Sequence, residues 1–212
     1  MRIIAGKLKG RRLVTIKGLE VRPTSDRVKE AVFRILGERV IGADFLDLCA
    51  GTGSIGLEAL SRGAKSVTFI ERDYHCIRVI ESNLEQCGFH PKHPQVQLIK
   101  REARKGLADL GTRNARFHLI YFDPPYDAGI HGACLGQIDR ERLLTQDGLM
   151  IVEHRRVHTD FRLPKSLRLR KSDTDPPLPV KSGELILNRQ EQYGDTMLSF
   201  YEWEFFTETS EV

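Results

Sequence analysis

The stretch Asp47-Leu48-Cys49-Ala50-Gly51-Thr52-Gly53-Ser54-Ile55-Gly56 decides the fold. It joins a short apolar run over residues 45–50, typical of a buried strand, to an apolar segment over residues 54–62 with the length of a helix. Its glycines have the spacing GxGxxG, and Glu71 ends the next apolar run 20 residues after Gly51. This arrangement indicates a ligand-binding turn between the first strand and helix of an α/β sheet.

The same alternation of strands and helices continues on both sides of this loop. An apolar stripe after Pro23 predicts a first helix. Further strands are predicted over residues 66–72, 96–100, 117–123 and 149–154, and further helices over residues 74–87, 103–110 and 131–145. Two strand-like runs, 184–189 and 197–205, then flank Tyr193-Gly194-Asp195-Thr196 with no helix between them. We therefore predict an α/β fold with a mainly parallel sheet that ends in an antiparallel hairpin.

Length and composition exclude several classes of protein. The 212 residues suffice for one domain, and no apolar run approaches the ~20 residues that span a bilayer. The four cysteines form no CxxC pair, and we expect no metal site. The start of the chain turns basic where a signal peptide needs apolar residues, so we expect a cytoplasmic protein.

Basic residues cluster in two segments of the chain. Residues 1–42 hold 11 Lys or Arg against 4 Asp or Glu, and residues 155–182 hold 8 against 3, whereas the whole chain carries only +4. Clustered cations release counterions from a phosphate backbone, which gives affinity for nucleic acid without sequence preference. Residues 1–22 are expected to form a strand, a hairpin or an arm that orders on a partner.

Asp47 indicates which ligand the glycine loop holds. A carboxylate beside a pyrophosphate costs energy in a site screened from water, which argues against a nicotinamide dinucleotide. S-adenosylmethionine carries an ammonium and a sulfonium and no phosphate, so it suits an acid at this position. A second interpretation, compatible with the first, is that Asp47 caps the glycine turn through backbone N–H groups.

The fourth predicted strand ends in Asp123-Pro124-Pro125-Tyr126. Consecutive prolines cannot donate to a ladder, so the strand stops in a rigid loop beside the glycine loop. The Asp123 carboxylate and the Pro124 carbonyl can accept from the exocyclic amine of a nucleobase, and the Tyr126 ring can stack on the base. Rigidity would hold the amine in line with a methyl donor.

With these motifs in view, the chain resembles S-adenosylmethionine-dependent amino-methyltransferases of the Rossmann-like class. More narrowly, it resembles the RsmD family, which methylates a guanine N2 in 16S ribosomal RNA. The matching stretches are residues 2–6, 22–31, 45–64, 123–126 and 193–196. The segment 22–31 and the final hairpin are specific to the family, whereas the glycine loop is generic.

The resemblance implies a seven-stranded sheet with the last strand antiparallel, S-adenosylmethionine as cofactor and S-adenosylhomocysteine as product. The cofactor-binding residues it implies are Asp47, Ala50, Gly51, Thr52, Gly53, Glu71, Arg72, Glu102 and Ala103. Glu102 departs from the family pattern, which has aspartate there to contact the adenine. The catalytic residues it implies are Asp123, Pro124, Pro125 and Tyr126, and the expected RNA-binding residues are Arg2, Lys7, Lys9, Arg11, Arg12, Arg22, Thr24 and Arg27.

The expected organisation is a basic RNA-facing arm and helix over residues 1–42, a methyltransferase domain over 43–206 and a tail over 207–212. The expected partner is 16S ribosomal RNA or the assembling small subunit, with no membrane, and the expected state is a monomer. Two alternatives stay open: an adenine-N6 methyltransferase acting on DNA or RNA, since the same tetrapeptide serves that amine, and a nucleic-acid-binding protein that has lost catalysis. A nicotinamide dehydrogenase would explain neither the proline loop nor the basic segments.

Overall fold

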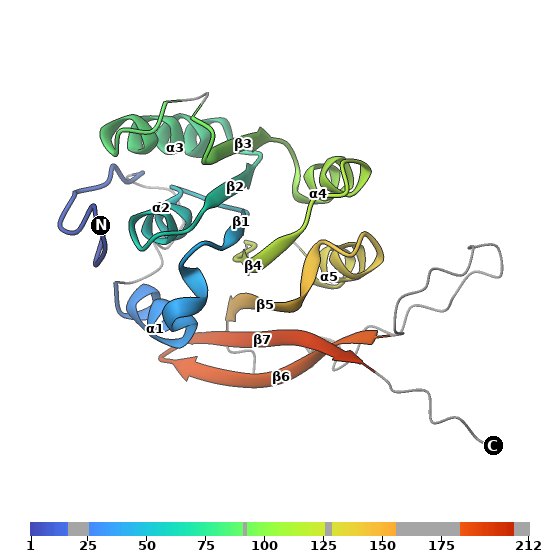
Figure 1. Cartoon of the computed structure of the whole chain (residues 1–212). Coiled ribbons are helices and arrows are strands. Elements are labelled where there is room, and N and C mark those ends of the chain that lie inside the picture. The colour runs from blue at the N-terminus through green and yellow to red at the C-terminus, as the bar shows by residue number, and fades with distance from the viewer. Residues whose placement is uncertain (17–25, 91–92, 126–128, 156–182, 206–212) are drawn as a thin grey trace, which may run out of the picture.

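The described part of the chain forms one seven-stranded sheet with helices on both faces (Figure 1). The structure, a computed structural model, describes residues 1–16, 26–90, 93–125, 129–155 and 183–205. The strands are β1 (Asp44–Leu48), β2 (Ser66–Glu71), β3 (Val96–Lys100), β4 (Phe117–Phe122), β5 (Leu144–Arg155), β6 (Gly183–Tyr193) and β7 (Thr196–Phe205). The helices are α1 (Asp26–Leu36), α2 (Ser54–Ser61), α3 (Tyr74–Gln86), α4 (Ala103–Thr112) and α5 (His131–Arg140), with a 3₁₀ turn, η1 (Gly37–Val40).

The strands lie in the order β3-β2-β1-β4-β5-β7-β6. The first five are parallel, and β7 runs antiparallel to both β5 and β6. The reversal between β6 and β7 occurs at Gly194, whose φ of 64° suits a glycine. The predicted sheet and its C-terminal antiparallel hairpin are thus confirmed. From β1 the strand order runs one way through β2 and β3 and the other way through β4 and β5, so the topological switch point lies between β1 and β4. Open α/β sheets bind ligands at such a point, beside the carboxyl ends of the strands.

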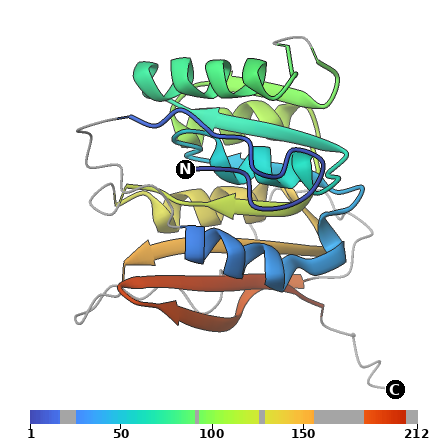
Figure 2. The ribbon, with the colours of Figure 1, turned by 90° about the vertical axis from the view of Figure 1, so that its left-hand side faces the viewer.

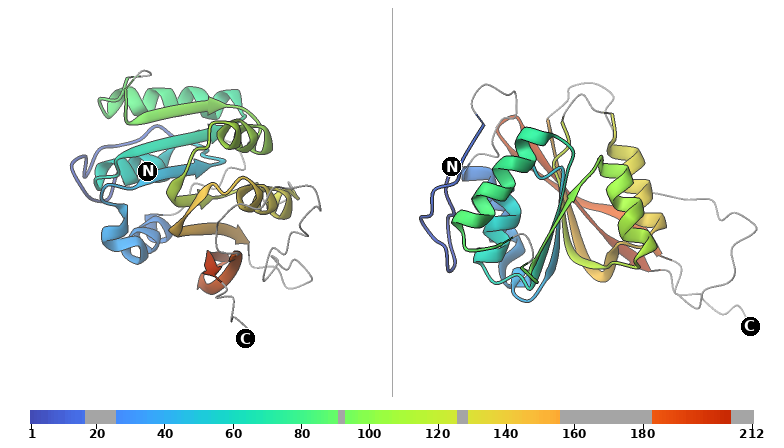
Figure 3. Two further views of the ribbon diagram at one scale, coloured as in Figure 1. Left: turned by 45° about the vertical axis from the view of Figure 1, so that its right-hand side comes forward. Right: turned by 90° about the horizontal axis from the view of Figure 1, so that it is seen from above.

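Two hydrophobic clusters, one on each face, hold the helices to the sheet. Alternate residues of the central strands point to opposite faces, so Phe45 and Tyr121 pack with α1, α2 and α3, whereas Leu46 and Phe122 pack with α4 and α5. Figure 3 shows these two layers of helices from above. Burial on both faces explains the nearly continuous apolar runs in the sequence.

The predicted helix over residues 131–145 is wrong at its end. Helix α5 stops at Arg140, and Arg142 adopts a left-handed φ of 51°. Leu143 then turns back into the second cluster, where it is fully buried, and β5 begins at Leu144. A nonglycine residue in the left-handed region gives no clear signal in the sequence, so the pattern alone extended the helix too far.

Residues 1–16 form a basic hairpin that packs across α2 and α3 (Figure 2). The backbones of Arg2 and Arg12 form an isolated antiparallel β-bridge. The N–H of Ile3 donates to the carbonyl of Arg11 at 2.9 Å. The side chains of Ile3 and Leu13 are buried in the same cluster as α1. Of the structures expected for residues 1–22, the hairpin is the one observed over residues 1–16, and residues 17–22 lie outside the described part of the chain.

None of the helices in the described ranges has both the length and the apolar character needed to cross a bilayer.

Candidate functional site

The tip of β1 forms the centre of the candidate site. Asp47 is only 2% exposed, and its Oδ2 accepts from the backbone N–H of Gly56 at 2.9 Å, in the first turn of α2. The predicted capping role of Asp47 is therefore observed. Gly56 is required for close packing, because a Cβ there would lie 2.3 Å from the Phe69 ring of β2. Asp47 thus ties β1 to α2 directly below the glycine loop.

Glu71, at the end of β2, holds the other side of that loop. Its Oε2 accepts from the N–H of Gly51 at 2.8 Å, and its Oε1 accepts from the N–H groups of Arg72 and Asp73 at 2.7 and 2.8 Å. Each carboxylate oxygen can accept more than one hydrogen bond, so these contacts leave room for a ligand hydroxyl. The loop itself closes through the N–H of Gly53, which donates to the Ala50 carbonyl at 2.8 Å.

The protein around the buried Asp47 disfavours the ionised form of its carboxyl group. Burial raises its pKa from 3.8 to about 8, the charge of Glu71 adds to this, and the Gly56 hydrogen bond opposes it. A cationic ligand would stabilise the ionised form. The chemistry of these residues therefore fits the sulfonium and ammonium of S-adenosylmethionine, and it would disfavour an anionic ligand.

Asp47→Asn should make the unliganded protein more stable, and more so at higher pH. Because the folded pKa lies above the unfolded value, wild type loses stability as pH rises from about 4 to about 8, and asparagine, which can still accept from Gly56, removes that loss. We expect the gain in unfolding free energy to be larger at pH 8 than at pH 5 by at least about 1 kcal/mol. Urea unfolding at both pH values measures it, and an equal effect at both would contradict the assignment.

Asn83 of α3 is a site residue that sequence reasoning missed. It is fully buried, and its Nδ2 donates to the Thr52 carbonyl at 3.0 Å and to the Val14 carbonyl at 3.2 Å. Its Oδ1 accepts from the Val14 N–H at 2.7 Å. The amide therefore links the basic hairpin to the glycine loop. The available signal was a polar residue on the inward apolar stripe of α3, between Ile80 and Leu84.

The end of β4 brings Asp123 next to β1. The N–H of Asp123 donates to the Leu48 carbonyl at 3.3 Å, and its side chain is partly buried. Pro124 is buried and Pro125 exposed, whereas Tyr126 lies outside the described residues. The structure therefore brings Asp123 and Asp47 to neighbouring strand ends, as the sequence predicts.

Asp47, Tyr121, Asp123 and Glu153 lie on one face of the sheet, and we call them the acidic cluster. Asp47 pairs with Tyr121 across β1 and β4, and Tyr121 pairs with Ile151 across β4 and β5. Asp123 and Glu153 follow two residues after Tyr121 and Ile151, so all four side chains leave the same face. The Tyr121 hydroxyl donates to Glu153 Oε2. Burial, then Glu153, then Asp47 raise the pKa of Asp123 well above its ordinary value.

The remaining predicted cofactor residues lie around these strand ends. Arg72 is exposed after β2, and Ala103 is the first residue of α4. Glu102 caps α4, because its carboxylate oxygens accept from the N–H groups of Arg104 and Lys105, each at 3.2 Å. A contact from Glu102 to an adenine stays a prediction. The two capping hydrogen bonds hold the Glu102 carboxylate at the start of α4, where it would make that contact.

The predicted RNA-binding residues lie mostly on the basic hairpin. The exposed cations there are Arg2, Lys7, Lys9, Arg11 and Arg12. Arg27 is exposed at the start of α1, whereas Arg22 and Thr24 lie outside the described residues.

Two charged residues beneath the hairpin were not singled out from the sequence. Glu58 of α2 is fully buried and accepts from the N–H groups of Ile4 at 2.7 Å and Ala5 at 3.0 Å. Lys29 of α1, also fully buried, donates to the Arg2 carbonyl at 2.6 Å. These contacts fix the hairpin to the body of the protein, and the exposed cations with it.

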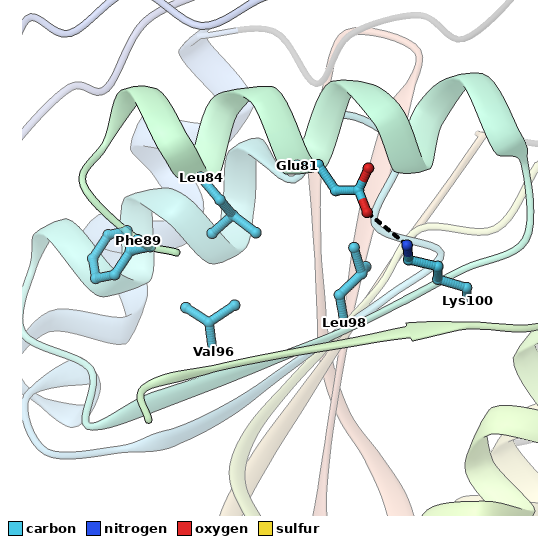
Figure 4. A pocket seen from close by; sticks show the side chains of 6 residues that line it. All are labelled: Glu81, Leu84, Phe89, Val96, Leu98 and Lys100. Carbon is cyan, nitrogen blue, oxygen red and sulfur yellow. Dashed lines mark hydrogen bonds and ion pairs between the residues drawn. The ribbon is translucent and has the colours of Figure 1, made fainter. Parts of the chain in front are cut away.

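A separate cavity of about 120 Å³ lies between α3 and β3 (Figure 4). Its lining is mainly apolar, and the ion pair of Lys100 with Glu81, at 2.6 Å, closes one end. None of the acidic cluster lines it, so it forms no part of the candidate site.

Comparison with known proteins places the chain in a family. Residues 1–175 match the family described as conserved hypothetical protein 95. YlbH of Bacillus subtilis (strain 168), provisionally named an rRNA methyltransferase, is 36% identical over 201 residues, which cover 95% of this chain and 98% of YlbH. Ribosomal RNA small subunit methyltransferase D of Escherichia coli (strain K12) is 28% identical over 204 residues, which cover 96% of this chain and 90% of that protein.

A solved structure from Escherichia coli, provisionally described as the methyltransferase yhhF, has the same architecture. It matches with a TM-score of 0.73 and 28% identity, covering 97% of this chain and 99% of that one. The predicted resemblance is thus confirmed over nearly the whole length. The chain belongs to the conserved hypothetical protein 95 family, the RsmD family whose motifs it carries.

Proposed function

We propose that this protein transfers a methyl group from S-adenosylmethionine to the exocyclic N2 amine of a guanine in 16S ribosomal RNA. The observation that carries the proposal is the pairing of two strand ends at the switch point of the sheet. Asp47, the last residue but one of β1, supplies a carboxylate suited to a cation, and Asp123 begins the proline loop after β4, where its N–H donates to the Leu48 carbonyl of β1. The relatives named as rRNA methyltransferases match along almost the whole chain, which supports ribosomal RNA as the substrate.

The residues of the site divide the work of the reaction. S-adenosylmethionine, when bound, supplies a methyl group on a sulfonium, so that transfer forms an N–C bond, breaks the C–S bond, leaves a neutral thioether and frees one amine proton. Asp47 and the glycine loop held by Glu71 bind the cation at the β1 side. Asp123 and the Pro124 carbonyl accept from the amine, which holds its lone pair toward the methyl group. Tyr126 stacks on the base, and Asp123 receives the released proton.

The RNA approaches, in this proposal, over the basic hairpin. Its cations are exposed, and Asn83 joins Val14 of the hairpin to Thr52 of the glycine loop, so an RNA strand bound there would pass beside the cofactor. Residues 1–42 would act as the RNA-facing extension and 43–206 as the methyltransferase domain. The target base must leave its stack to enter the site, which favours a loop over a duplex.

The direct test follows the methyl group from labelled S-adenosylmethionine into naked 16S ribosomal RNA, small ribosomal subunits and DNA in parallel. Digestion to nucleosides and mass spectrometry then identify the product. N2-methylguanosine from either ribosomal substrate supports the proposal, and the more active one identifies the physiological substrate. N6-methyladenosine would support the adenine-N6 alternative, and no labelled nucleoside would support the catalytically inactive one.

Reversing the charge of Arg11 and Arg12 to glutamate should weaken RNA binding and flatten its dependence on salt. Both side chains are exposed on the hairpin, and each phosphate contact removed lowers the slope of log K against log[salt] by about 0.7–0.9. Fluorescence anisotropy with labelled RNA at several salt concentrations measures the slope. Arg113→Glu and Arg116→Glu, exposed changes near β4, serve as the matched control. An unchanged slope in the hairpin variant would mean that the hairpin does not contact phosphate.

A further inference from the structure

Glu153 of β5 is a buried acid that the proposed reaction does not yet use. Its side chain is 4% exposed. It lies on β5, the strand next to β4, and on the same face of the sheet as Asp123. The Tyr121 hydroxyl donates to its Oε2, and Tyr121 is itself fully buried. Burying a carboxylate is costly unless hydrogen bonds compensate it, and the Tyr121 hydroxyl supplies one such bond and fixes Glu153 beside the end of β4.

The groups around Asp123 come from each neighbouring strand. Asp47 of β1, Tyr121 of β4 and Glu153 of β5 interact electrostatically with Asp123. The charge of Asp123 also acts on the Cys49 thiol, in the loop after β1. After burial, Glu153 is the largest cause of the raised pKa of Asp123, ahead of Asp47. The negative charge of Glu153 therefore makes Asp123 a better proton acceptor than burial alone would.

The acidic cluster is unevenly divided between the two ends of the proposed reaction. Asp47 lies at the cofactor side, and the pair Asp123 and Glu153 lies at the side of the amine. Positive charge leaves the cofactor side and arrives at the amine nitrogen as the new bond forms. Negative charge at the receiving end therefore stabilises the transition state more than the ground state.

We propose that Glu153 is a positioning residue for methyl transfer, which acts through Asp123. Held by the Tyr121 hydroxyl, it keeps the Asp123 carboxyl turned toward the amine and makes that carboxyl the acceptor of the amine proton. The N–H electrons stay on nitrogen, and the proton forms an O–H bond on Asp123. This inference rests on the proposed function. It adds that the charge of Glu153 is what makes Asp123 basic enough to accept the proton from the amine.

The first test needs no substrate. Carboxyl ¹³C NMR of the unliganded protein follows the titration of Asp123, which is identified by the signal missing from Asp123→Asn. In Glu153→Gln, whose amide oxygen can still accept from Tyr121, the Asp123 midpoint should fall by at least about one pH unit, because a like charge has been removed. In the control Glu204→Gln, an exposed residue of β7, it should not move. An unmoved midpoint in Glu153→Gln overturns the inference.

The second test uses the reaction. Glu153→Gln should shift the acidic limb of the pH profile to lower pH, and it should lower kcat on ribosomal RNA, measured above that limb, by about 10-fold, a part of the ~10²–10⁴ that a positioned proton acceptor contributes. S-adenosylhomocysteine binding by calorimetry should stay within about twofold, because Asp47 and the glycine loop are intact. Loss of this binding together with kcat would indicate a structural role and overturn the inference.

Tyr121→Phe provides a second variant if Glu153→Gln does not fold, since it removes only the donor to Glu153. It should move the Asp123 midpoint and the acidic limb in the same direction, and no movement overturns the inference. The wild-type chain, assayed alongside, separates the two claims. If wild type makes no N2-methylguanosine, the proposed function fails whatever the variants do, whereas an active wild type with unaltered variants removes Glu153 alone.

Discussion

Asp123→Ala will abolish methyl transfer to ribosomal RNA, with a fall in kcat of at least about 10³-fold, while S-adenosylhomocysteine binding survives. The expected loss is large because one carboxylate has two duties in the proposed site. It accepts from the target amine, which orients the lone pair, and it receives the proton that the amine loses. The binding of the cofactor depends instead on Asp47 and on the glycine loop that Glu71 holds, neither of which the substitution alters.

Two further variants sharpen this test. Asp123→Asn keeps the shape and one acceptor oxygen but cannot take a proton, so it should retain more activity than alanine and still fall well below wild type. Asp147→Ala, which removes an exposed acid just before the buried part of β5, should leave kcat unchanged. Labelled methyl transfer measures activity, and calorimetry measures binding. Full activity in Asp123→Ala would remove this residue from the mechanism.

The parts of the site that the sequence predicted are those set by local pattern. Asp47 lies next to the last residue of β1 and Glu71 is the last residue of β2, both strands have short and clearly bounded apolar runs, and parallel strands bring such ends to one edge of a sheet. The two prolines after Asp123 stop β4 at a defined residue. The glycine spacing reports a turn and a close helix–strand contact, and Gly56 against Phe69 is that contact. Each of these features depends on residues near one another in the chain.

The missed parts depend on contacts between distant residues. Glu58 follows the apolar Leu57 in α2 and gives no sign that it accepts from Ile4 and Ala5, more than 50 residues earlier. Tyr121 could be assigned to the core, but its bond to Glu153 needs the register of β4 and β5. Periodicity predicts which face a residue occupies, whereas the partner it meets there depends on packing of the whole sheet.

The contacts of Glu58 also make the basic hairpin sensitive to a single substitution. Besides the two backbone N–H groups, Glu58 accepts from Arg62 at 2.8 Å and lies 3.9 Å from Lys29. Burial lowers the pKa of Lys29, and the charge of Glu58 is the largest effect opposing it. Without Glu58, the lysine would be a buried cation that has lost this counterion, and the hairpin would lose two of its anchors.

Glu58→Ala should therefore lower the free energy of unfolding by about 3–5 kcal/mol, the usual effect of breaking a buried ion pair from one side. The matched control is Glu85→Ala on the exposed face of α3, which should change it by less than about 0.5 kcal/mol. Urea unfolding measures both.

Adding Lys29→Met should recover part of the loss, because it removes the buried cation while keeping an apolar side chain. A double variant no more stable than Glu58→Ala would show that the lost hairpin anchors dominate. Limited proteolysis within residues 1–16 should become faster in Glu58→Ala, and RNA affinity should fall along with it, since the cations would no longer be held beside the glycine loop. A stability unchanged from wild type would mean that the hairpin is held by Ile3, Leu13 and the Ser61 contacts alone.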